Sequence, residues 1–262
     1  MIRSLFSASS GMSAQTFLID TISNNLANVN TNGFKKVRVD FQDLLYQTIR
    51  PAGSSTDTTT RVPSGIQVGH GSRVADTQRI FTQGNFRLTE NPLDLVIEGD
   101  GFFKLALADG TEVYSRDGSF TLDQDGNIVT SDGYLLDPNI TIPEDAVDIA
   151  VGRDGTVSIR SAGETESTEV GQIQLTDFIN PPGLKAIGQN LFIETTASGT
   201  PIEAIPGQDG LGQINNGFLE SSNVSVVEEL VQMIIGQRAY EVNAKAVQTA
   251  DEMLQTANNV KR

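Results

Sequence analysis

The sequence contains no cysteine and only one histidine among its 262 residues. Disulfide bonds, thiolate metal sites and thiol chemistry are therefore excluded. Catalysis by a serine–histidine pair would have to use His70, which lies between two glycines with no nucleophile motif nearby. We interpret His70 as an ordinary loop residue. The sequence indicates no catalytic residues, and we do not expect an enzyme.

Long apolar runs and basic segments are also missing. No apolar run approaches the ~18 residues that a membrane-spanning helix needs, so we expect no membrane insertion. The formal net charge of −15 argues against nucleic-acid binding, which requires a basic face. The first residues lack the continuous apolar segment of a secretory signal peptide, and we expect export by that route not to be used.

An acidic segment at residues 123–127 allows two interpretations, a calcium loop or a hairpin turn. An EF-hand loop needs glycine at its sixth position and glutamate at its twelfth. Counted from Asp123, Gly126 is only fourth and position twelve is Tyr134. We therefore favour the hairpin turn. We expect no metal ligands, no cofactor and no cofactor-binding residues.

Apolar residues recur every seven positions at both ends of the chain, which predicts two long helices that pack as a coiled coil. The row at the start contains Leu5, Met12, Ile19 and Leu26, and the row at the end contains Val226, Met233, Tyr240, Val247 and Leu254. We expect these nine residues to form the assembly interface. A second apolar row near the end contains Ile235, Ala239, Val242, Ala246, Met253 and Val260.

The helix boundaries follow from local sequence. The first helix is predicted over about residues 4–28, and its Ser-, Thr-, Asn- and Gln-rich interior needs a packing partner to become helical. The last helix is predicted over 226–260, with Ser225 and Glu228 as a capping box. Glu229 is interpreted as a second acid that favours the positive end of the helix dipole. The alternative is an ordinary amphipathic helix on a globular core.

The middle of the chain is predicted to be β-rich, because Asp-Gly pairs suited to tight turns recur between residues 100 and 133. We expect a meander of short antiparallel strands there, with strands at 93–97, 102–107, 119–122, 127–130, 156–159 and 190–194. The fold class is therefore α+β, with long N- and C-terminal helices and an antiparallel central body. The expected domains are 1–30 with 224–262 (helical), 31–70 (extended connector) and 71–223 (β-rich body).

Residues 47–70 are rich in Thr, Ser, Gly and Pro, with only scattered apolar residues. Such a segment is extended or irregular. It is either a flexible linker, which is the default, or a strap ordered against another subunit. The strap would include Arg50, Pro51, Thr58 and Pro63. The charge also divides along the chain: residues 31–223 carry −14 of the net charge and the ends are near neutral, which favours assembly through the ends.

Several motifs together resemble the bacterial flagellar rod and hook family of axial proteins. They are NNLANVNTNGFK at 24–35, NPLDLVIEGDGFF at 91–103, YSRDGSFTL at 114–122 and GFLESSNVSVVEELV at 217–231. The resemblance implies helical tubes whose inner wall is a coiled coil of both terminal helices. It also implies export through the flagellar type III channel. Within the family, the chain length and the segment 46–67 resemble subunits of the distal rod more than those of the hook.

The function that this resemblance implies is mechanical. We expect a structural subunit that assembles into a straight, rigid tube in the flagellar basal body, where the rod crosses the periplasm, and transmits torque from motor to hook. The implied partners are further copies of the chain, other rod proteins, the hook protein, the type III export apparatus and the surrounding basal-body rings. One alternative is a proximal rod protein of the same family. An alternative from another class is a secreted β-domain binding module with a helical stalk.

Overall fold

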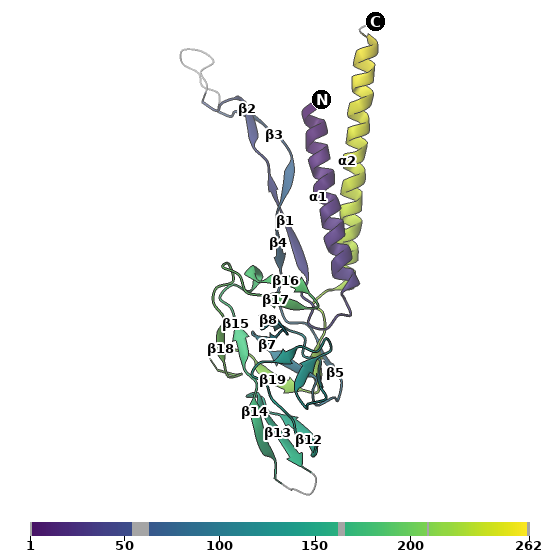
Figure 1. Ribbon diagram of the computed structural model, residues 1–262. Coiled ribbons are helices and arrows are strands. Elements are labelled where there is room, and N and C mark those ends of the chain that lie inside the picture. The colour runs from purple at the N-terminus through teal and green to yellow at the C-terminus, as the bar shows by residue number, and fades with distance from the viewer. Residues whose placement is uncertain (1, 54–62, 162–165, 209, 261–262) are drawn as a thin grey trace. The chain divides into compact units, whose positions relative to one another are not determined.

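The computed structural model describes residues 2–53, 63–161, 166–208 and 210–260. The chain forms two compact units (Figure 1). Unit 1 comprises Met1–Ala27, Val37–Gln78 and Ser225–Arg262, and unit 2 comprises Asn28–Lys36 and Arg79–Val224. The expected division gave residues 31–70 a part of their own as a connector. In the structure, residues 37–78 belong to the same unit as the helices. None of the described helices has the length and hydropathy of a membrane span.

The two helices of unit 1 are α1 (Ile2–Ala27) and α2 (Val226–Val260), which lie side by side in Figure 1. They run antiparallel, since a Cβ added at Gly11 would contact Asn243 and one added at Gly236 would contact Ile19. The predicted helices are confirmed to within two residues at each end. α2 starts directly after Ser225, whose carbonyl accepts the Glu229 N–H at 3.0 Å.

The polar sequence of α1 is accommodated in two ways. Hydroxyl groups of Thr16, Thr21 and Ser23 donate to carbonyls one turn earlier, at 2.7–3.0 Å, so they are satisfied within the helix. Other residues of α1 are buried and form a row that comprises Ala8, Ala14, Ile22 and Asn25. The helix therefore owes its stability to packing of this row, as its weak intrinsic propensity requires.

The stretch 37–78, which lies in the sequence between the two parts of unit 2, forms a two-stranded ribbon. β1 (Val37–Asp43) is hydrogen-bonded to β4 (Ser72–Arg79), and β2 (Tyr46–Arg50) pairs antiparallel with β3 (Ile66–Gly69). The default prediction of a flexible linker over 47–70 is therefore wrong for 47–50 and 66–69. The physical reason is that Ile49, Ile66 and Val68 are good strand formers, and they outweigh the Gly and Pro between them. Thr58 lies outside the described residues.

Unit 2 is built from short strands and one 3-10 turn, η1 (Pro181–Gly183). In chain order the strands are β5 (Phe86–Leu88), β6 (Leu95–Glu98), β7 (Phe102–Ala106), β8 (Glu112–Ser115), β9 (Phe120–Leu122), β10 (Ile128–Thr130), β11 (Leu135–Leu136), β12 (Ala146–Val151), β13 (Thr156–Ser161), β14 (Thr168–Gln172), β15 (Leu175–Asp177), β16 (Lys185–Gly188), β17 (Leu191–Ile193), β18 (Ile202–Ala204), β19 (Gln213–Asn216) and β20 (Phe218–Glu220). Each of the six strands predicted from the sequence overlaps one of these.

The largest sheet has nine strands and is not the simple meander that was expected. Its main path is β16-β17-β8-β7-β11-β10-β9, with β15 joining β7 to β18. A three-stranded sheet, β12-β13-β14, adds to the same apolar core, which includes Phe103, Leu105, Val157 and Ile214. The late strands β19 and β20 pair with the early strands β6 and β5. These long-range pairings close the unit.

The Asp-Gly pairs account for the local turns and not for the long-range pairing. Gly110, Gly126 and Gly133 lie at positive φ in the turns β7–β8, β9–β10 and β10–β11. Hairpin turns are thereby confirmed at these three pairs, including the acidic segment 123–127. The pairs at 100–101 and 117–118 connect strands that do not pair with each other. At Gly118 an added Cβ would collide with the Leu95 carbonyl, so close packing requires the glycine.

Candidate assembly site

The contact face of α2 follows a seven-residue repeat, although not the one that apolar residues alone suggest. Along this face Met233, Val247 and Leu254 are half-buried. They alternate with a second row of Glu229, Gly236, Asn243 and Ala250. Gly236 faces α1: a Cβ added there would lie 3.4 Å from Cγ1 of Ile19, an ordinary van der Waals contact. Both rows have the spacing of a coiled coil.

The nine predicted interface residues separate into two groups. Seven are half-buried on the two helices: Leu5, Met12, Ile19, Leu26, Met233, Val247 and Leu254. The other two, Val226 and Tyr240, are 39% and 41% exposed. Exposure thus separates seven residues that are half-buried within the chain from two that are more exposed. Of the seven, Ile19 lies at the seam between α1 and α2, since a Cβ at Gly236 would be 3.4 Å from its Cγ1.

One end of the seam is fixed by a buried polar contact that sequence reasoning missed. The Asn25 side chain accepts from Val37 N at 3.0 Å and donates to Val37 O at 2.9 Å, as a neighbouring strand would. Its amide nitrogen also lies 3.2 Å from Oε2 of Glu229. Both side chains are buried, so their polar atoms would be costly to leave without hydrogen bonds. Glu229 thus has a specific contact beyond the dipole role predicted for it.

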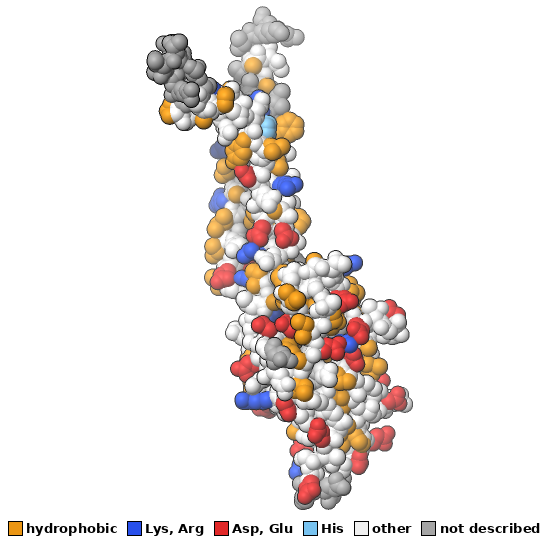
Figure 2. Space-filling view, turned by 90° about the vertical axis from the view of Figure 1, so that its left-hand side faces the viewer, with side chains coloured by type: hydrophobic (Ala, Val, Ile, Leu, Met, Phe, Trp, Pro, Cys, Tyr) orange, Lys and Arg blue, Asp and Glu red, His pale blue; other side chains and the backbone are white. Residues whose placement is uncertain are grey.

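The second apolar row of α2 lies outside the seam. Ile235 is 62% exposed, Val242 68% and Met253 48%; Ala246 is exposed and Ala239 half-buried. We call Ile235, Val242, Ala246 and Met253 the free row. Further exposed apolar residues in the first turns of α2 are Val227, Leu230, Val231 and Ile234. Figure 2 shows apolar side chains at the surface of unit 1. An apolar surface of this kind marks an interaction site.

The ribbon of unit 1 also exposes apolar residues. Leu45 is 88% exposed, Ile49 57%, Tyr46 55% and Ile66 46%. Of the predicted strap residues, Arg50 ends β2, Pro51 follows it and Pro63 precedes β3, and all three are exposed. A two-stranded hairpin is at best marginally stable by itself in water. The ribbon is thus a second surface that favours a partner.

The charge divides between the units as the sequence predicts. Unit 1 contains nine Lys and Arg and ten Asp and Glu, whereas unit 2 contains nine Lys and Arg and 23 Asp and Glu. Unit 2 therefore carries nearly all of the net charge of −15. Acidic side chains are accordingly prominent on the face of unit 2 in Figure 2. Near-neutral helices can pack copy against copy without strong repulsion.

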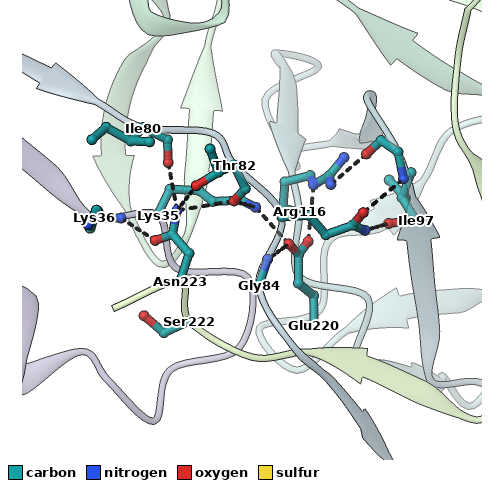
Figure 3. Close-up of polar contacts among 12 residues, drawn as sticks. Lys35, Lys36, Ile80, Thr82, Gly84, Ile97, Arg116, Glu220, Ser222 and Asn223 are labelled. Atoms are coloured by element: carbon teal, nitrogen blue, oxygen red, sulfur yellow. Dashed lines mark hydrogen bonds and ion pairs between the residues drawn. The ribbon is translucent and has the colours of Figure 1, made fainter. Parts of the chain in front are cut away.

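Unit 2 contains a buried cluster of three charged side chains, Lys35, Arg116 and Glu220 (Figure 3). Nζ of Lys35 lies 2.7 Å from Oε1 of Glu220 and donates to the Thr82 carbonyl at 2.9 Å. Nε of Arg116 lies 3.2 Å from Oε2 of Glu220. Burial, and then the neighbouring Arg116 guanidinium, lower the pKa of Lys35, while Glu220 opposes that shift. We call these three residues the junction cluster.

No catalytic or metal constellation emerges within the parts of the chain that the structure describes. His70 is half-buried in the link between β3 and β4. Among the described residues, no three His, Cys, Asp or Glu side chains are placed to hold a metal ion. The exposed apolar surfaces of unit 1 are suited to contacts with other protein chains.

Three models of known protein families match parts of this chain. A family model described as "Flagella basal body rod protein" matches residues 5–35, and one described as "Flagellar basal body rod FlgEFG protein C-terminal" matches 215–260. A third, "Flagellar hook protein FlgE/F/G D1 domain", matches 96–159. The matches thus cover α1, α2 and part of the sheets of unit 2.

Complete relatives agree with the family models. The flagellar basal-body rod protein FlgG of Borreliella burgdorferi is 53% identical over 264 residues, and the match spans the whole of both chains. The FlgG protein of Caulobacter vibrioides is 47% identical over 261 residues, covering 99% of this chain and all of that one. The chain belongs to the flagellar basal-body rod protein family. It is a structural subunit of the rod and is located in the flagellar basal body, as the sequence predicts.

The seam within this rod subunit can be tested by placing a charge in it. Replacing Met12 or Val247 by Asp should destabilise the packing of α1 on α2 by roughly 2–4 kcal/mol, because a carboxylate would lose water in an apolar contact. Amide exchange of the monomer should then show loss of protection in α1, with the strands of unit 2 unchanged. Thr16→Asp, at an exposed position of α1, is the matched control. Equal exchange in all three variants would show that the seam is assigned wrongly.

Proposed function

We propose that this rod subunit forms the distal part of the rod, a straight and rigid helical tube that carries torque from the motor to the hook. The observation that carries the proposal is the free row on α2. A single chain has only one α1 to cover α2, and α1 covers the face that contains Met233 and Val247. The free row remains for a neighbouring copy.

The arrangement of the helices supports assembly through this row. Covering the free row with helices of further copies would bury large apolar side chains, each contributing about 1.5–3 kcal/mol when fully buried. Because unit 1 is near neutral, the helices of many copies can pack together without strong repulsion. The acidic surface of unit 2 stays in contact with water. The exposed positions of Val226 and Tyr240 are consistent with contacts between chains. We infer that the seven half-buried residues of the predicted interface pack within a chain. Val226 and Tyr240 would instead make contacts between chains.

The ribbon supports the distal assignment. The segment 46–67 resembles the strap of distal rod subunits, and its described part is a hairpin with exposed Leu45, Tyr46 and Ile49. In a tube that must not bend, such a hairpin is well suited to insert between neighbouring subunits. A proximal rod subunit of the same family is the alternative. The further partners that we propose are the other rod proteins, the hook protein, the type III export apparatus and the surrounding rings.

Assembly through the free row leads to a specific prediction. Val242→Asp should leave the monomer as helical and as stable as the wild type, because the position is 68% exposed. The variant should nevertheless fail to form tubes, since every copy would bury an unpaired carboxylate. Circular dichroism and electron microscopy of the same preparations measure the two effects. Gln248→Asp, at an exposed polar position of α2, should still form tubes. Tube formation by Val242→Asp would contradict the proposed interface.

A second prediction concerns the ribbon. Deleting residues 47–67 should leave a subunit that polymerises through its helices but gives curved, more flexible tubes. The physical reason is that the free row still drives association, whereas the contacts that resist bending are lost. Tube curvature in electron micrographs measures the outcome. If the deletion variant forms normal straight rods, the segment is a passive linker and the distal assignment loses its support.

A further inference from the structure

Three segments of unit 2 meet at the points where the chain enters and leaves that unit. They are residues 32–36, which lie between α1 and β1, residues 79–84, which follow from β4, and residues 220–224, which lead into α2. The first and last belong to the motifs that stood out in the sequence, and the assembly surfaces do not explain them. Hydrogen bonds and a buried ionic cluster hold the three segments together.

Short hydrogen bonds connect each segment to the other two. Gly33 N donates to the Glu220 carbonyl at 2.8 Å, and Lys36 N donates to Oδ1 of Asn223 at 2.7 Å. Ile80 N donates to the Lys36 carbonyl at 2.9 Å. The Asn223 amide nitrogen donates in turn to the Ile80 carbonyl at 2.9 Å. Figure 3 shows Asn223 between Lys36 and Ile80.

The junction cluster adds a buried ionic connection between the same segments. Lys35 reaches both Glu220 and the Thr82 carbonyl, and Gly84 N donates to Oε1 of Glu220 at 2.7 Å. Glu220 thus faces two cations, Arg116 and Lys35, and the charge of Asp100 also acts on Lys35. A second buried cation costs desolvation energy, consistent with the lowered pKa of Lys35. What Lys35 provides is a connection that no apolar side chain could make.

The packing of α1 on α2 must select one register, and a fixed connection near the helix ends would do so. A seven-residue repeat allows two helices to slip by one repeat, about 10 Å, and still match row to row. The native register places Asn25 at Glu229 and Gly11 at Asn243. Only nine residues lie between Asn25 and Lys35, and eight lie between Glu220 and Glu229. If Lys35 holds Glu220, these two short connections leave little slack.

We propose that Lys35 is a positioning residue whose buried contacts with Glu220 and Thr82 set the register in which α1 packs against α2. The helix rows supply the attraction and the junction cluster selects one of the registers that the repeat allows. This inference concerns the single chain. It stands whether or not the subunit belongs to the distal part of the rod.

The absence of cysteine makes the register measurable by disulfide trapping in the full-length monomer. A Gly11→Cys/Asn243→Cys pair reports the native register, because a Cβ at Gly11 would lie 3.4 Å from Cγ of Asn243. A Gly11→Cys/Ala250→Cys pair reports slippage by one repeat. We expect only the native pair to cross-link in the otherwise wild-type chain. Adding Lys35→Met should lower the yield of the native disulfide and produce the slipped one.

The matched control is Lys104→Met, which removes another lysine of unit 2. Lys104 contacts Glu112, Asp137 and Glu203 at 2.8–2.9 Å, and none of these residues belongs to the three segments. This variant should leave both disulfide yields unchanged. Amide exchange at Gly33 should rise roughly tenfold or more in Lys35→Met, as expected for loss of a charged hydrogen bond nearby, and should not rise in Lys104→Met.

Asn223→Ala keeps the proposal testable if Lys35→Met impairs folding of unit 2. It removes the neutral contacts to Lys36 and Ile80 without leaving a buried charge unpaired, and it should shift the disulfides in the same direction. If Lys35→Met and Asn223→Ala both fold and give the wild-type disulfide pattern, the register is set within the helices themselves and the proposal is wrong.

Discussion

The surface of α2 sets the main constraint on this chain. α2 has 35 residues and α1 has 26, and apolar side chains lie on more than one face of α2. One α1 helix can cover a single face of α2, the face that contains Met233 and Gly236. The remaining apolar surface of α2 is exposed to water in the single chain. Covering it with a partner helix is energetically favourable. The exposed ribbon and the near-neutral charge of unit 1 act in the same direction.

The two units differ in the surfaces that they expose. Unit 1 provides the surfaces that favour other chains. Unit 2 has its own apolar core and most of the charge, and it folds on contacts within the chain. The junction cluster lies at the place where unit 2 holds the connections to the helices. The chain thus combines exposed apolar surfaces in unit 1 with a body that has its own apolar core.

The sequence predicted the parts of this fold that repeat at short range. Both helices were placed to within two residues because their apolar rows extend over many turns, and the local hairpins followed from Asp-Gly pairs. The second row of the seam was missed because Glu229, Gly236, Asn243 and Ala250 share no chemical character; only the presence of α1 makes them a row. Pairing of β6 with β19, and of β5 with β20, joins residues more than a hundred positions apart, which no local pattern encodes.

The junction cluster was beyond sequence reasoning for a related reason. Lys35 and Glu220 each look like a surface residue, and their burial depends on a contact between distant segments. The ribbon was missed because its strands are short and its composition is typical of linkers. In contrast, the resemblance to flagellar axial proteins rested on motifs in the same segments, and the comparisons confirmed the family.

Cryo-electron microscopy of tubes assembled from the purified protein, at a resolution that shows side chains, tests the central claim most directly. We expect Ile235, Val242 and Met253 of each copy to lie in contact with helices of neighbouring copies, inside a tube of α1 and α2. Straight tubes in which these side chains face water, with the copies held together through unit 2, would contradict it.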